Sequence, residues 1–235
     1  MPSKAFQIFH SYSSPEVSSI IDIFEERNSR RGRNKDYALL YGNLMLLVSA
    51  WEVYCEEVSR EAIGKLVESS KVSFDHLPAS LQRRIIMYAY PLNLSHQDPL
   101  ATKIAKLPGS GWKALLKEML DDYLHDFNTP KFSRGKGKNL KELLGFYLGI
   151  DVVTELDAVI REIDCAKGID RLISIRGAIA HKGMPDEQDR FSSAEMRQYL
   201  NRVLKVSAAI EYLVHREFRS VYGLTPWNII VVPDF

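Results

Sequence analysis

The chain has 235 residues, of which 46% are hydrophobic and 26% are charged, and its formal net charge is +1. This length allows one large domain with a substantial core, while the balanced charge excludes a strongly basic coat protein, so any nucleic-acid contact must come from local patches. No run approaches the roughly 18 continuous apolar residues of a membrane span, and the amino terminus lacks the profile of a secretion signal. We therefore expect a soluble, cytoplasmic protein that does not bind a membrane.

Apolar residues at helical spacing predict two helices in the first quarter of the chain. Ser14-Pro15-Glu16 places a proline in a first helical turn after a capping serine, and this helix is expected to end before residue 30. A much longer amphipathic helix covers residues 37–62, where apolar residues recur at three- and four-residue steps without a proline. We expect this long helix to anchor the core.

Prolines punctuate the middle of the chain and predict short helices between them. The expected segments are residues 78–89, 97–106 and 111–125. After a glycine-rich basic loop, Asn139 is expected to cap a further helix that Gly149 stops.

The last third of the chain predicts two more helical regions and a short extended tail. Residues 152–181 form the first region, with a break expected near Gly168, and Ser192 and Glu195 form a capping box that starts a long last helix. Residues 229–232 are the only convincing strand-like run. Long helices with short connections predict an all-α, antiparallel helical bundle with additional peripheral helices, and no alternation of strands with helices supports a parallel sheet.

Arg176 and His181 are the residue types that phosphodiester chemistry needs. The guanidinium fork matches phosphate oxygens and keeps its charge, and an imidazole takes and gives a proton near neutral pH. On a helical period Arg176 falls on the core-facing stripe, where a cation needs a partner, and Glu52 at the edge of the long helix's apolar stripe is the acid we expect to support it. A structural ion pair that fixes helix register is the alternative interpretation.

His181 cannot share a helical face with Arg176. Ideal geometry places it about 140 degrees around the helix and roughly 7.5 Å along it. Gly183, followed by Met184 and Pro185, is expected to end the helix just beyond His181 and to leave the imidazole near the rim. The alternative role for this histidine is a stabilising interaction with the carboxyl end of its own helix.

Residues 131–141 form a basic loop with five cations, one aromatic ring and no acid. Glycines let its backbone approach phosphates, and Phe132 offers a ring that could stack on a base. The cations that we expect to contact RNA are Lys131, Arg134, Lys136, Lys138 and, at the end of the Arg-His segment, Lys182. A solvated connector is the alternative, and the run Arg27, Arg30, Arg31, Arg33 and Lys35 has the same two interpretations.

The remaining metal-ligand and thiol residue types do not form a recognisable site. Cys55 and Cys165 have no paired spacing and fall on or beside apolar helical stripes, so buried free thiols are expected. The other histidines form no local metal-ligand spacing. We expect no metal and no cofactor.

Taken together, Trp51-Glu52 on the long helix and the segment 172–183 with Arg176 and His181 resemble the HEPN superfamily. These are small helical-bundle proteins marked by an Arg, four to six intervening residues and a His, and the chain is most similar to the RiboL-PSP-HEPN branch. The resemblance covers roughly residues 36–215. One position departs from the pattern, because the family often has a polar residue, commonly Asn, where Gly177 follows the arginine.

The resemblance implies a domain organisation and a function. We expect one helical domain over residues 1–235, with a core at about 36–215, a variable insertion at about 70–130 and an apolar tail at 224–235. The implied activity is a metal-independent endoribonuclease that cuts single-stranded RNA by 2'-hydroxyl attack. It also implies a homodimer through the Arg-His face, acting as a defence or toxin-antitoxin effector with an antitoxin or other defence partner. The alternative is a non-catalytic helical module that binds RNA or a protein.

Overall fold

The computed structural model describes residues 1–29, 37–90, 109–127, 130–133, 139–160, 164–185 and 187–228. Within these ranges the secondary structure is helical and contains no β-strand, so the prediction of an all-α fold is confirmed. In chain order the elements are α1 (Lys4–Ile8), η1 (Phe9–Ser13), α2 (Ser14–Asn28), α3 (Tyr37–Glu68), η2 (Phe74–His76), α4 (Ala79–Ala89), α6 (Gly111–His125), α7 (Leu140–Leu148), α8 (Val152–Ile160), α9 (Cys165–Lys182), η3 (Glu187–Asp189) and α10 (Ser193–Tyr222).

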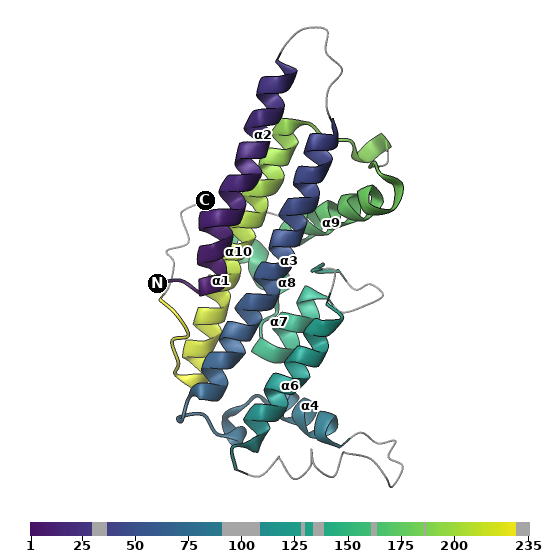
Figure 1. Cartoon of the computed structure of the whole chain (residues 1–235). Coiled ribbons are helices and arrows are strands. Elements are labelled where there is room, and N and C mark those ends of the chain that lie inside the picture. The colour runs from purple at the N-terminus through teal and green to yellow at the C-terminus, as the bar shows by residue number, and fades with distance from the viewer. Residues whose placement is uncertain are drawn as a thin grey trace.

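Three long helices, α2, α3 and α10, lie side by side along the length of the molecule (Figure 1). α2 runs antiparallel to α3, whereas α10 runs in the same direction as α3 (Figure 1). α9 packs against the half of α3 where that helix begins, and α4 and α6 gather near the end where it finishes. The bundle therefore has α3 as its central member, as the sequence predicts.

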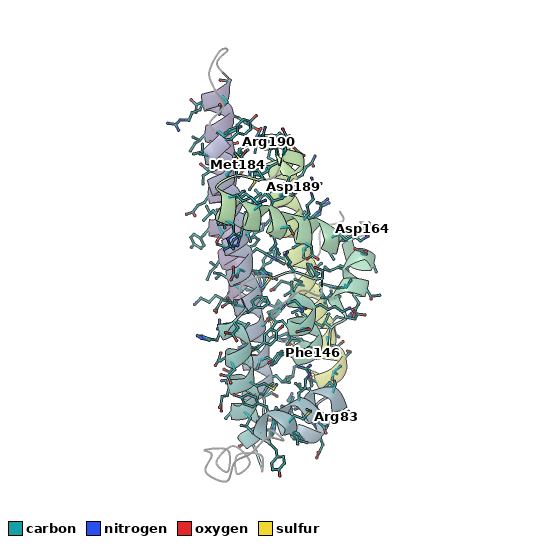
Figure 2. The ribbon with its side chains drawn as sticks, turned by 90° about the vertical axis from the view of Figure 1, so that its right-hand side faces the viewer. Arg83, Phe146, Asp164, Met184, Asp189 and Arg190 are labelled. Carbon is teal, nitrogen blue, oxygen red and sulfur yellow. The ribbon has the colours of Figure 1, made fainter. Side chains whose placement is uncertain are left out.

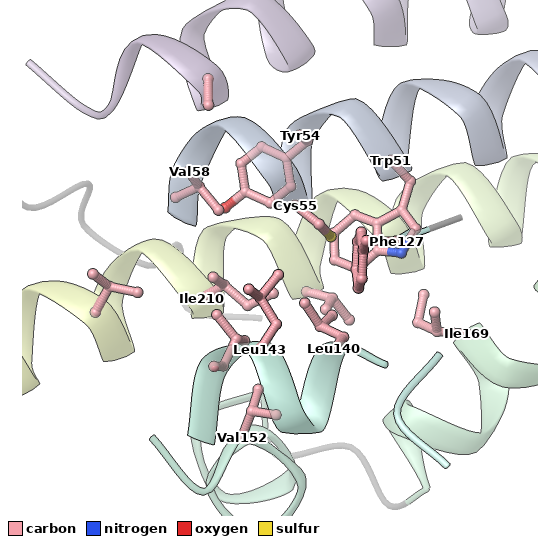
Figure 3. Packing of buried hydrophobic residues seen from close by; sticks show 14 of the residues in the cluster. Trp51, Tyr54, Cys55, Val58, Phe127, Leu140, Leu143, Val152, Ile169 and Ile210 are labelled. Carbon is pink, nitrogen blue, oxygen red and sulfur yellow. The ribbon is translucent and has the colours of Figure 1, made fainter. Parts of the chain in front are cut away.

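α3 is central because its apolar side chains contact helices on several sides. Trp51, Tyr54 and Cys55 point from α3 toward Leu143 of α7 and Ile210 of α10 (Figure 3). By length and composition alone α3 could also cross a membrane. In this fold its apolar residues are buried against α2, α6, α7, α9 and α10.

The two cysteines are buried and form no disulfide, as the sequence predicts. Burial raises the pKa of the Cys55 thiol well above its ordinary value, because the thiolate would lose its hydration inside the apolar core. This thiol is therefore part of the packing of α3.

Several helix ends lie where the sequence places them, because a local capping group fixes each one. Asn139 accepts a hydrogen bond from the Glu142 N–H at 2.9 Å, and Gly149 ends α7 with a φ of 77°. Ser192 and Glu195 form the expected capping box at the start of α10. The expected helix at 97–106 and the strand-like run at 229–232 lie outside the described residues.

The amino-terminal helix begins earlier than the Ser14-Pro15 signal predicts. α1, η1 and α2 follow one another directly, and the actual capping residue is Ser3, whose side chain accepts the Phe6 N–H at 3.0 Å. Ser14 is buried, and its hydroxyl donates to the His10 carbonyl at 3.0 Å. α2 therefore begins at Ser14 with Pro15 in its first turn, as predicted, but Ser14 is not its cap, because the chain enters α2 directly from the π-type turn of η1.

The break predicted near Gly168 is present, but it lies before Cys165 and not at the glycine itself. α8 ends at Ile160 and α9 begins at Cys165, with Asp164 in left-handed backbone conformation at a φ of 62°. Gly168 lies inside α9, where a Cβ atom would come within 2.6 Å of Nη1 of Arg202. The glycine therefore makes room for an α10 side chain and does not interrupt the helix.

Candidate active site

The candidate site is built on α9, which crosses α3 and has Asp164 and Met184 near its two ends (Figure 2). The Asp157 carboxylate fixes the beginning of this helix, because it accepts the backbone N–H groups of Asp164 at 3.4 Å and Cys165 at 3.2 Å. The beginning of α9 is therefore held by a side chain of α8.

The carboxyl end of α9 is where the sequence predicts it. Gly183 follows Lys182 with a φ of 76°, a left-handed conformation that favours glycine, and its N–H donates to the Ile179 carbonyl at 2.8 Å. The helix is continuous through Arg176 and His181. These two side chains consequently leave different faces of α9.

Arg176 is half-buried and His181 is exposed. The Nε atom of Arg176 is fully enclosed and has no hydrogen-bond partner within the described ranges. No ion pair of Arg176 is recorded among the residues that the structure describes. An enclosed donor without a partner is costly, so the position of this guanidinium calls for an explanation beyond packing.

Glu52 lies near Arg176 without forming a direct ion pair with it. Glu52 is half-buried on α3, burial raises the pKa of its carboxyl, and the positive charge of Arg176 partly opposes that rise. Within the described ranges no contact of 4 Å or less joins the two charged groups. The electrostatic coupling fits the expected supporting role of Glu52, and that role stays a prediction.

The segment before the basic loop is fastened to α9. The Lys131 ammonium donates to Ser174 Oγ at 3.1 Å, and the Asp170 carboxylate accepts the N–H groups of Phe132 at 2.7 Å and Ser133 at 2.8 Å. Asp170 and Ser174 are one helical turn apart, so a single face of α9 holds this segment. Lys131 is thereby placed beside the helix that carries Arg176 and His181, and its expected contact with RNA stays a prediction.

Phe132 does not have the exposed ring that base stacking needs. Its side chain is only 2% exposed and belongs to the hydrophobic core. The interpretation of Phe132 as a stacking residue is wrong, because the two hydrogen bonds to Asp170 draw this part of the segment inward. Arg134, Lys136 and Lys138 lie outside the described residues, as do Arg30, Arg31, Arg33 and Lys35.

Trp51 links the long helix to this segment, a role that sequence patterning alone does not reveal. The indole is completely buried, and its N–H donates to the Pro130 carbonyl at 3.5 Å. Trp51 therefore supports the residue directly before Lys131, while its neighbour Glu52 interacts with Arg176. The Trp-Glu pair thus serves both parts of the candidate site from one position on α3.

One face of α9 connects Lys131 to the histidine. Ser174 and His181 are seven residues apart, which places them at nearly the same angle and roughly 10.5 Å apart along the helix axis. Gly177 lies between them, and a Cβ atom there would meet no other atom within 4 Å. This open face ends at Lys182, which is exposed.

A metal site is not recorded in the part of the chain that the structure describes. No group of three or more His, Cys, Asp or Glu side chains there has the proximity to hold an ion.

These features define an all-helical protein with an Arg-His pair at the carboxyl end of one helix and a buried Trp-Glu pair on the helix beneath it. The RiboL-PSP-HEPN family matches residues 11–215, which is most of the chain, and the protein belongs to this family. Comparison with curated proteins and with solved structures found no match.

Proposed function

We propose that this protein is a metal-independent endoribonuclease of the HEPN type that cuts single-stranded RNA. The observation that carries the proposal is Arg176, whose guanidinium is held half-buried with an enclosed, unpartnered Nε, five residues before an exposed His181. A cation used only for stability would have its donors satisfied. A phosphate oxygen is the acceptor that suits a planar guanidinium fork.

The proposed reaction uses the RNA as its own nucleophile. The 2'-oxygen attacks the adjacent phosphorus and loses its proton, while the bond from phosphorus to the 5'-oxygen breaks and that oxygen gains a proton. His181 carries out one of these proton transfers, and Arg176 stabilises the charge on the phosphoryl oxygens. The products are a 2',3'-cyclic phosphate and a 5'-hydroxyl.

We further propose that two copies of the chain form the complete site. Arg176 and His181 leave different faces of a continuous α9, so one copy does not readily present both groups to the same phosphate. A two-fold dimer through this face would bring the arginine of one copy toward the histidine of the other. Lys131 and Lys182 then flank the RNA.

The first experiment is cleavage of single-stranded RNA in excess EDTA. The wild-type protein is expected to cut RNA and to leave the corresponding DNA intact, because DNA lacks the 2'-hydroxyl. His181→Ala and Arg176→Ala are expected to lose cleavage while retaining a cooperative unfolding transition. His125→Ala, an exposed histidine on α6, is the matched control and should cut normally. Cleavage that persists in His181→Ala contradicts the proposal.

A mixing experiment tests the shared site. Each inactive variant retains one of the two groups, so a heterodimer of Arg176→Ala with His181→Ala contains one complete site if the groups come from different copies. Random exchange then restores about a quarter of the wild-type activity. No restoration after subunit exchange, verified by native mass spectrometry, would place both groups of each site in one copy.

The cellular role that we propose is a cytoplasmic effector of a defence or toxin-antitoxin system, held in check by a partner protein. Gly177, in place of the polar residue common in the family, favours the rival function of a non-catalytic RNA- or protein-binding module. Expression in a host cell separates the two. Growth arrest that Arg176→Ala or His181→Ala relieves supports the enzyme. An innocuous wild type, with partner binding unchanged in both variants, supports the module.

A further inference from the structure

A groove of about 490 Å³ lies between the first turns of α3 and the connection from α9 to α10. Its walls include Tyr37 and Tyr41 from α3 and Met184, Arg190 and Phe191 from the connection. Figure 2 shows Met184 and Arg190 at the end of α9 that carries His181. The volume falls within the roughly 300–1,000 Å³ typical of small-molecule sites.

Three aromatic rings of this groove contact one another in a row that runs from the core to the surface. Tyr37 stacks on Tyr41 with a distance of 6.1 Å between ring centroids and an interplanar angle of 24°. The ring centroids of Tyr41 and Phe191 are 5.7 Å apart. Phe191 is buried, whereas Tyr37 is 40% exposed. The outermost ring of this row, that of Tyr37, is therefore accessible to solvent or to a flat ligand.

Arg190 supplies a positive charge at this groove. Its side chain is exposed, and no described residue forms an ion pair or hydrogen bond with its guanidinium. The acid of the same groove is Glu195, whose carboxylate accepts the N–H of Ser192 at 2.8 Å and the Ser192 hydroxyl at 2.9 Å. These hydrogen bonds lower the pKa of Glu195 and hold its negative charge at the start of α10. An aromatic surface beside an exposed guanidinium matches a planar base attached to a phosphate.

The groove also lies close to the proposed catalytic histidine. Met184 is three residues beyond His181, and three residues can span at most about 11 Å. Because Gly183 turns the chain at this point, the groove begins where α9 ends. A ligand in it would therefore be continuous with RNA bound at His181.

We propose that this groove binds one unpaired base of the RNA next to the scissile phosphate, by stacking on Tyr37 and by contact with Arg190. The proposal rests on the ribonuclease function above and adds a reason for single-stranded substrates, because a paired base cannot reach the ring. An aliphatic side chain of a protein partner would use neither the ring face nor the guanidinium plane as fully. The occupant that the groove fits best is a nucleobase.

The test measures RNA affinity without cleavage. His181→Ala serves as the parent, and a fluorescent single-stranded oligonucleotide is titrated with it by anisotropy. Adding Tyr37→Ala is expected to weaken binding by about 5- to 150-fold, the range for loss of one base-aromatic stack. Tyr37→Trp should retain the affinity of the parent, and Tyr12→Ala, an exposed tyrosine in η1, is the matched control that should change nothing.

A second measurement identifies the base. A set of oligonucleotides with one abasic position each is titrated with the parent and with the Tyr37→Ala variant. Removal of the base at one position should weaken binding to the parent by a factor similar to that of Tyr37→Ala. The same abasic oligonucleotide should bind the Tyr37→Ala variant no more weakly than the intact one does. Arg190→Ala provides the same comparison if Tyr37→Ala fails to fold.

The outcomes separate this proposal from the function on which it rests. Equal affinities of parent and Tyr37→Ala, or an abasic series with no sensitive position, overturn the base site even if the wild type cuts RNA, and would leave the groove to a protein occupant. If one abasic position weakens binding only when Tyr37 is present, and the wild-type protein never cuts RNA, the base site is supported and the proposed ribonuclease function is refuted.

Discussion

Glu211 of α10 gives the protein a pH-dependent stability that a single substitution should remove. This carboxyl is 1% exposed and accepts hydrogen bonds from the Ser3 N–H at 3.0 Å and from the Ser3 hydroxyl at 2.5 Å. Burial raises its pKa from 4.5 to about 7, even though the hydrogen bonds from Ser3 favour the ionised form. Folding therefore favours the protonated acid.

The size and sign of the effect follow from this pKa. Each pKa unit corresponds to about 1.4 kcal/mol, so ionised Glu211 lowers the free energy of unfolding by about 3 kcal/mol relative to the neutral acid. Below pH 4.5 both states hold the proton, and the contribution is fully present. Between pH 4.5 and 7 the unfolded chain ionises while the folded protein keeps its proton, so stability falls as the pH rises. Above about pH 7 the loss is complete.

Glu211→Gln stays neutral and should lack this decline. Urea unfolding of wild type and variant at intervals from pH 4.5 to 8 measures the difference, which should move by about 3 kcal/mol in favour of the variant across that range. Taking the difference cancels the other titrating groups. Glu16→Gln, on the exposed surface of α2, controls for the loss of one charge. A difference between wild type and Glu211→Gln that stays constant with pH would refute the reasoning.

Two further predictions concern α9. Gly177→Ala adds a methyl group into open space within a helix and should stabilise the protein by roughly 1 kcal/mol, or about 2–4 °C in Tm. In Gly168→Ala the added methyl group would clash with Arg202, so this variant should gain less stability or lose some. Equal shifts of the two variants in thermal unfolding would contradict this. Asp170→Ala leaves the N–H groups of Phe132 and Ser133 without their acceptor and should cost about 1–3 kcal/mol in urea unfolding. It should also weaken RNA binding, since Lys131 loses its support. Unchanged stability in this variant would mean that water replaces the carboxylate.

The sequence predicts well those features that neighbouring residues determine. Asn139, Gly149 and Gly183 act within one helical turn, so their positions can be read without knowledge of the fold. The inward stripe of α9 is likewise a local periodicity, and it places Arg176 correctly at the boundary of the core. The central position of α3 follows from its continuous apolar pattern.

Features that depend on distant contacts could not be predicted. Phe132 stands among cations in the sequence, and its burial depends on Asp170, which lies 38 residues later. Gly168 suggests a helix break in the sequence, but the glycine is needed there because a Cβ atom would clash with the Arg202 side chain of α10. The start of the first helix depends on Ser3, which Glu211 holds from the far end of the chain.

The candidate site shows the same division. Arg176 and His181 stand out because their chemistry is distinctive and their spacing is short. The aromatic groove cannot be found from the sequence, because Tyr41 and Phe191 are 150 residues apart and meet only through the packing of α3 against the connection before α10. The hydrogen bond from Trp51 to Pro130 is hidden for the same reason.

The most direct test of the central claim is the chemistry of the cut ends. Single-stranded RNA is incubated with the protein in EDTA, the cut position is mapped, and a second RNA with one 2'-deoxy nucleotide on the 5' side of that position is treated identically. Mass spectrometry should find a 2',3'-cyclic phosphate and a 5'-hydroxyl from the first RNA and no cut at that position in the second. Arg176→Ala and His181→Ala should leave both RNAs uncut. Cleavage of the deoxy-substituted position, or 5'-phosphate products, would contradict the account.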